Sequence, residues 1–383
     1  MTQSPRPDPA PSPSNRPPRP TNQIEVGIKD NSGQAIAQME NSRATSIGDG
    51  AYIENAYFSG NVPLSAAAVD RETPSLLPYL ADRSDQEYAL GKFIRTLQGE
   101  IPPGPLVILI HGDEFQCHLK FMERLKTLSL PRILAKYYSA DPDEIVIQEH
   151  QLDWPSGLKE LSDLSERLQV DLAETVLDDP YASLGEINQA FYRFPGIKMI
   201  STTLLTSEWK DCRVNVLEKL LEFWQQWPPL MPDQKLIVCI SVKYQLMRSR
   251  PSGKFGLSWL FNFWKCWKAW RRRKHCQQIN AEIGKGIDAI AASNFERFDR
   301  LFGIVLPKLT GVRRSHVEDW VRSEAKEFLG EANLAILMGA VRDMYDALDE
   351  QSSENEATLS MEELSNQLIK FLKSDFDEAG KAA

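Results

Sequence analysis

The stretch PLVILIHGDEFQCHLKF, residues 105–121, has the pattern of a buried strand, a tight turn and a helix. The continuous apolar run 106–110 is typical of a strand that is covered on both faces, and His111-Gly112 ends it. An acidic pair follows, and the next residues have helical spacing. A strand, a glycine turn and a helix in this order build phosphate-binding loops, so the stretch raises the question of a nucleotide site.

Four further apolar runs predict strands, at 144–150, 196–205, 235–242 and 301–307. Each gap between consecutive runs is long enough for a helix, which favours parallel strands joined by crossovers. The predicted fold class is α/β, with a doubly wound, mostly parallel five-stranded sheet of the P-loop NTPase type. Ser84 with Glu87 and Ser360 with Glu363 have capping-box spacing, which predicts a helix start at each serine.

The composition divides the chain into four parts. Residues 1–20 are rich in proline, which predicts a disordered tail. Residues 23–62 are rich in Gly and Asn turn signals between short apolar pieces, which predicts a small β-rich lead-in. Residues 72–325 are expected to form the α/β domain, and residues 326–383 acidic C-terminal helices.

The cellular location is predicted from three absences in the sequence. The five cysteines form no CxxC pair, which suits free thiols in a reducing compartment. The first 20 residues lack the apolar core of a signal peptide, and no long uninterrupted apolar run would span a membrane. We therefore expect a cytoplasmic protein.

The P-loop pattern G-x-x-x-x-G-K-[ST] can be laid on residues 112–119. The first glycine is Gly112, but Cys117 replaces the second glycine, His118 the lysine and Leu119 the hydroxyl residue that holds Mg²⁺. A cysteine brings a Cβ to a place where backbone must approach phosphate, and leucine cannot coordinate a hard cation. Histidine is shorter than lysine and mostly neutral at pH 7.

Other features of the loop also argue against catalysis. Asp113 and Glu114 place negative charge where a triphosphate would lie, and the strands at 196–205 and 235–242 lack a terminal aspartate for Mg²⁺. An α/β-hydrolase would need a G-x-S-x-G elbow besides its His-Gly turn, and the chain has none. We expect no enzyme activity, no metal and no cofactor. The degenerate phosphate-loop positions are His111, Gly112, Asp113, Glu114, Cys117, His118 and Leu119.

The same residues resemble a known family, the inactive STAND proteins, which are degenerate relatives of the nucleotide switches in bacterial signalling and conflict systems. The resemblance rests on the lead-in 72–90, the loop region 105–125, the strand 235–244 and the segment 306–321, which together span about 250 of the 383 residues. It implies a P-loop-like fold without the residues for hydrolysis. It also implies a scaffold or sensor that acts through protein–protein interaction.

A second unusual segment lies between the fourth and fifth predicted strands. From Asp233 to Glu282 no acidic residue intervenes, while eleven basic residues do. Aromatic residues accompany them in the stretch 255–276. The candidate partner-binding residues are Trp259, Trp264, Trp267, Trp270, Arg271, Arg272 and Arg273.

Three interpretations of the segment 255–276 stay open. It could be a packing helix whose tryptophans cover the sheet. It could bind an anionic membrane surface, since interfacial Trp with Lys and Arg is typical of such contacts. It could also dock a protein, because Trp and Arg dominate binding hot spots, whereas the net charge of −9 disfavours nucleic acid.

We expect a non-catalytic scaffold or sensor with an unidentified protein partner. The first alternative is a divergent nucleotide-binding protein that uses His118 with Arg313 or Arg314. The second is an adaptor that lies on a membrane surface through the segment 255–276. The acidic stretch from Asp343 to Glu378 is complementary in charge to that segment and suggests a clamp onto it, within one chain or between chains.

Overall fold

The computed structural model describes residues 77–97, 104–138, 141–155, 160–209, 215–246, 259–323, 325–327, 329, 331–349 and 357–382. The predictions for the Pro-rich tail 1–20 and the lead-in 23–62 fall outside these residues.

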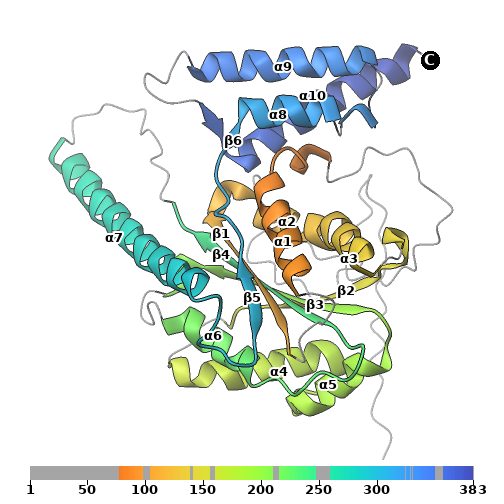
Figure 1. Cartoon of the computed structure of the whole chain (residues 1–383). Helices are drawn as coiled ribbons and strands as arrows, with labels where there is room; N and C mark the ends of the chain where they lie inside the picture. The colour runs from red at the N-terminus through yellow and green to blue at the C-terminus, as the bar shows by residue number, and fades with distance from the viewer. Residues whose placement is uncertain are drawn as a thin grey trace, which may run out of the picture. The chain divides into compact units, whose positions relative to one another are not determined.

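A five-stranded parallel sheet forms the centre of this part of the chain, as the sequence predicted (Figure 1). The strand order is β2-β3-β4-β1-β5. The strands are β1 (Leu106–Asp113), β2 (Ile147–Leu152), β3 (Ile197–Leu205), β4 (Leu236–Tyr244) and β5 (Phe302–Val305). The chain starts beside the centre, crosses to one edge, returns strand by strand and ends at the other edge.

Helices cover both faces of the sheet, so the fold is doubly wound. One face packs against α1 (Ser84–Thr96), α2 (His118–Arg124) and α3 (Leu130–Tyr138), with the π-helical turn η3 (Leu125–Ser129) between the last two. The other face packs against α4 (Leu164–Leu177), α5 (Leu184–Arg193), α6 (Asn215–Gln225) and α7 (Trp259–Ala292). Short 3-10 helices are η1 (Leu77–Tyr79), η2 (Glu114–Gln116), η4 (Pro142–Glu144), η5 (Leu161–Asp163), η6 (Thr206–Trp209) and η7 (Ala325–Glu327).

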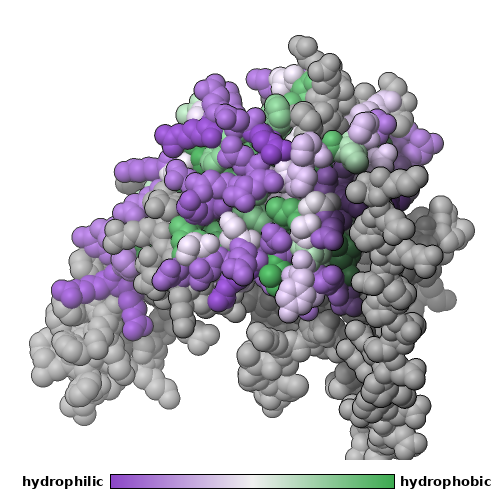
Figure 2. Space-filling model, turned by 90° about the horizontal axis from the view of Figure 1, so that it is seen from below, coloured by the Kyte–Doolittle hydropathy of each residue, from purple (hydrophilic) through white to green (hydrophobic). Residues whose placement is uncertain are grey.

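The side chains along β1 point alternately to the two faces of the sheet, which explains why residues 106–110 are all apolar. Val107 and Leu109 lie in the core under α4 to α7, while Leu106, Ile108 and Ile110 lie in the core under α1 to α3. Successive side chains of a strand point to opposite faces, so a strand covered on both sides needs apolar residues at every position. Figure 2 shows the face seen from below, where hydrophilic side chains dominate and hydrophobic ones are scattered.

A group of C-terminal elements follows the sheet. They are β6 (Val312–Arg313), α8 (Arg314–Ser323), α9 (Glu331–Asp349), β7 (Thr358–Leu359) and α10 (Met361–Ala382), with β6 and β7 paired antiparallel. Their apolar side chains form a cluster that also takes in Leu80 and Ala81 from the start of the described chain. The Tyr345 hydroxyl donates to the carbonyl of Val312 at 2.8 Å and ties α9 to β6. Leu80 and Ala81, shortly before the start of α1, therefore pack against the C-terminal helices.

The capping predictions have different outcomes. Ser360 caps α10, because the Glu363 amide donates to its hydroxyl at 3.3 Å. The capping box at Ser84 is wrong: Arg83 is the residue before α1, and it makes no side-chain cap. The Glu87 carboxylate instead accepts hydrogen bonds from Arg124 Nε at 2.8 Å and from the Ser129 hydroxyl. The Glu87 side chain therefore bonds to Arg124, which is distant along the chain, and not to the start of α1.

Candidate functional site

The first strand is longer than the sequence pattern predicted. His111-Gly112 does not end β1, since the pairing with β4 continues to Asp113 opposite Tyr244. Only after Asp113 does the chain turn, through η2 into α2. This turn lies at the carboxyl ends of β1 and β4, the edge where open α/β sheets bind their ligands.

Gly112 makes room for another part of the protein. The Leu309 amide donates to the His111 carbonyl at 2.8 Å, and Gly112 and Leu309 form a parallel bridge. A Cβ on Gly112 would lie 2.6 Å from Leu309 Cβ and 2.7 Å from its carbonyl oxygen. The glycine that matches the phosphate-loop pattern is thus required for close packing of the chain after β5.

Gly112→Ala is expected to lower the free energy of unfolding by about 1–3 kcal/mol, because the backbone of Leu309 must move to admit the methyl group. Chemical denaturation measures this change. Gly339→Ala is the control, since no atom outside its own helix lies within 4 Å of the added methyl and alanine favours helix. A Gly112→Ala protein as stable as the unmodified one would contradict the packing role.

His118, at the position of the P-loop lysine, is 1% exposed. Its Nε2 lies 3.0 Å from the Asp113 carbonyl oxygen, which can only accept, so Nε2 carries the proton. Nδ1 then accepts from the Ser241 hydroxyl at 2.8 Å. Burial lowers the pKa of His118 to about 3. The side chain is therefore a neutral link between α2, the end of β1 and β4.

This burial predicts a pH dependence of stability. The unfolded His118 takes up a proton near pH 6.5, while the folded one resists it down to a pKa of about 3. Stability present above pH 6.5 is therefore lost as the pH falls through this window, by at most about 1.4 kcal/mol per pH unit. Unfolding titrations between pH 7 and pH 4 should show a shallower slope in His118→Gln. The exposed His275 supplies the control, His275→Gln, which should keep the slope of the unmodified protein. Equal slopes in all three proteins would count against the buried neutral histidine.

The other degenerate loop positions are engaged within the chain. Glu114 Oε1 accepts from the Leu246 amide at 2.8 Å, just after β4. Asp113 lies 3.6 Å from Lys308 Nζ. Leu119 packs at the margin of the core under α1 to α3. Cys117 adopts a left-handed conformation with φ of 51° before α2, and burial raises the pKa of its thiol to about 11, so the thiol stays protonated.

Two buried arginines, which the sequence analysis did not single out, hold the loop from the N-terminal side. Arg83 is 2% exposed, and its guanidinium donates to Gln116 Oε1 at 3.1 Å and to the Thr310 carbonyl at 3.2 Å. Arg124 donates to the carbonyls of Leu80 at 2.7 Å and Asp82 at 2.8 Å. These partners are up to 227 residues apart along the chain, so no local pattern could have revealed them.

The C-terminal helix completes the enclosure of the loop. α10 contacts both η1 and η2. Cys117 packs against the C-terminal apolar cluster. The loop after β1 is thus bounded by residues 77–83, by β4 and by α10.

His111 and His118 have different hydrogen-bond partners. His111 Nδ1 lies 2.8 Å from the Tyr244 hydroxyl, with the rings edge-on at 5.9 Å, and burial lowers the pKa of His111. Within the described residues no group of three or more His, Cys, Asp or Glu side chains is placed to hold a metal ion. Each histidine instead joins β1 or α2 to β4.

The basic segment forms the first part of α7, a 34-residue helix that connects β4 to β5. Its second half is anchored: Ile283 and Ile287 are buried in the core, and Asn280 bonds the Thr206 hydroxyl at 2.7 Å and the Gln245 carbonyl at 3.0 Å. In Figure 1 the helix runs outward from the sheet toward its N-terminal end.

The consecutive residues Arg271 to His275 are all exposed. They cover more than one turn, so this stretch of α7 has no buried side. Trp259, Trp264, Trp267 and Trp270 lie in the same helix, and their side chains fall outside the described part. Among the described helices, none is both long and apolar enough to cross a membrane.

Comparison with known proteins gives a family match for part of the chain. Residues 78–242 match the family described as inactive STAND. No curated protein matches the chain. Among solved structures, the chain is similar to the Orc1 protein of Aeropyrum pernix in complex with DNA, with 13% identity over 77% of this chain and 68% of that chain and a TM-score of 0.29. At this TM-score the similarity supports no conclusion about this chain. The family match covers α1, the loop and strands β1 to β4, and it confirms over residues 78–242 the inactive STAND resemblance that the sequence predicted.

Proposed function

We propose that this chain is a non-catalytic module, a scaffold or sensor in bacterial signalling or defence, that acts by binding other proteins. The observation that carries the proposal is that His118 is buried and hydrogen-bonded within the chain. A P-loop lysine is a free cation that reaches the β- and γ-phosphates of a nucleotide. Here the corresponding side chain is neutral, buried and hydrogen-bonded at both ring nitrogens.

The surroundings of His118 support the same function. A phosphate site needs room for the ligand beside the backbone of the loop. In this chain Gly112 is covered by Leu309, and Gln116 is held by Arg83. The fold of a nucleotide switch is kept, while the place of the nucleotide is taken by side chains of the protein.

The exposed turn Arg271–His275 on α7 is the surface that best suits a partner. Arginine is among the residues that dominate binding energy at protein interfaces. Because the turn is exposed all round, a partner could enclose it. An anionic membrane surface is the second candidate, since each basic residue near such a surface contributes about 1 kcal/mol.

The catalytic part of the proposal is tested by phosphate release. Purified protein with ATP or GTP and Mg²⁺ is expected to release phosphate no faster than buffer alone. Hydrolysis that disappears in His118→Ala would favour the divergent nucleotide-binding alternative and refute the proposal.

The binding part is tested by affinity capture and mass spectrometry with the triple variant Arg271→Glu, Arg272→Glu, Arg273→Glu. A matched control reverses three exposed charges elsewhere: Lys92→Glu, Arg95→Glu and Arg193→Glu. We expect proteins that the unmodified and control chains retain and the triple variant loses. In a parallel flotation assay, binding to phosphatidylserine vesicles that the triple variant loses would favour the membrane alternative. Identical capture by all three chains would contradict a role for this turn.

A further inference from the structure

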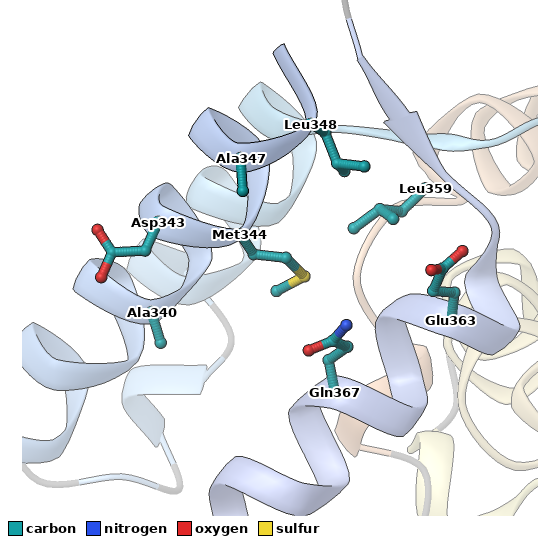
Figure 3. Close-up of a pocket in the computed structure, with 8 residues that line it drawn as sticks. All are labelled: Ala340, Asp343, Met344, Ala347, Leu348, Leu359, Glu363 and Gln367. Carbon is teal, nitrogen blue, oxygen red and sulfur yellow. The ribbon is translucent and has the colours of Figure 1, made fainter. Parts of the chain in front are cut away.

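A groove of about 530 Å³ lies between α9 and α10 (Figure 3). Met344 and Leu348 from α9 and Leu359 from β7 supply apolar lining. Two alanines of α9 also line it, and their small side chains let another backbone come close. An apolar groove of this kind accepts the side of an amphipathic helix.

The charges at this groove all have one sign. Asp343 from α9 and Glu363 from α10 are the charged residues in its lining, and both are exposed. Figure 3 shows the two carboxylates on opposite sides of the apolar lining. The groove therefore favours a helix that carries apolar and basic residues together.

We infer that the groove receives the basic half of α7 from a second copy of this chain. The first sixteen residues of α7, 259–274, include six basic residues, six aromatic residues and no acidic one. Of these, Arg271 to Lys274 are exposed. The groove and the exposed residues Arg271 to Lys274 thus have opposite charge, and the sequence of the segment 259–274 also contains apolar residues.

The anchoring of α7 argues for a second copy over the same chain. α7 is continuous from Trp259 to Ala292, and Ile283 and Ile287 hold its second half in the core. At 1.5 Å per residue, Arg272 lies about 16 Å along the helix axis from Ile283. Any movement of its own α7 into the groove would have to pull these buried isoleucines out of the core and expose them to water. Association between copies needs no such rearrangement.

The geometry of association follows from symmetry. If each copy inserts its α7 into the groove of the other, the pair closes with twofold symmetry. If insertion is one-directional, chains of copies form. The inference deepens the proposed function, because it names the second copy as one partner. It is tested on purified protein alone, so its failure would leave the capture of other proteins unaffected.

The first measurement is analytical ultracentrifugation of the full-length protein from about 1 to about 100 μM. We expect an average mass that rises above the monomer mass of 43.4 kDa as the concentration increases. Higher salt should weaken the association, because exposed charges are screened within about 10 Å at 0.1 M salt.

Charge reversal identifies the two surfaces. Asp343→Lys/Glu363→Lys in the groove and Arg272→Glu/Arg273→Glu on α7 are each expected to weaken self-association by at least about tenfold. An equimolar mixture of the two variants should associate again, because the acidic α7 of one then meets the basic groove of the other. Asp343→Lys alone avoids any change at the start of α10 and should weaken association in the same direction.

The matched control is Glu166→Lys/Glu174→Lys, which reverses two exposed carboxylates on α4 and should associate as the unmodified protein does. The inference is overturned by any of three results. These are a monomer at every concentration, groove variants that associate as tightly as the unmodified protein, and a mixture of reversed variants that stays monomeric.

Discussion

His118→Lys is expected to lower the free energy of unfolding by about 3–5 kcal/mol, and it should not create nucleotide binding. The substitution restores the lysine of the P-loop pattern, but the position is buried and its neighbours are a carbonyl and a hydroxyl. An ammonium group there loses its hydration, and the charged groups that act on the present imidazole, Lys243 and Arg83, are both cations. The cost is that of an uncompensated buried charge.

Chemical denaturation and ATP titration of the same protein check both parts of this prediction. His275→Lys is the control, because His275 is exposed on α7 and such surface changes usually stay within about 0.5 kcal/mol. A His118→Lys protein that is stable and binds ATP would show that the loop is a latent nucleotide site, which the closed geometry does not allow.

Arg124→Ala is the second change with a large expected effect, a loss of about 3–5 kcal/mol in stability. The guanidinium joins α2 to the carbonyls of Leu80 and Asp82 and to the Glu87 carboxylate. Its removal leaves buried acceptors without a donor and a cavity beside residues 77–83.

Arg132→Ala, on the exposed side of α3, is the matched control and should stay within about 0.5 kcal/mol of the unmodified protein. Hydrogen exchange would locate the effect of Arg124→Ala, with faster exchange in 77–83 and in α2. Equal stability of the two arginine variants would contradict the role assigned to Arg124.

The sheet could be predicted from the sequence because its physical cause is local. A strand covered on both faces must be apolar along its buried run, as β1 is over 106–110 and β4 over 236–240, and the long gaps between runs favour crossovers. The exact end of β1 could not be predicted, since it depends on pairing with residues of β4 more than a hundred positions away. The capping box at Ser84 failed for the same reason, because Arg124 takes Glu87.

The candidate site shows the same division between local and long-range causes. The sequence identifies the loop positions, because Cys117, His118 and Leu119 depart from a known pattern at known offsets. What fills the loop depends on contacts from Arg83, Ser241 and α10. No sequence pattern near these residues predicts the contacts. Arg83 is like any charged surface residue in the sequence, and only the structure shows that it is buried.

The loop after β1 is a closed structural element. Isothermal titration calorimetry with ATP and with GTP, each with and without Mg²⁺, is the experiment that tests this closure. We expect no heat of binding at nucleotide concentrations up to about 1 mM, because His118, Gly112 and Gln116 are already engaged within the chain. Micromolar binding that is lost in His118→Ala would contradict it.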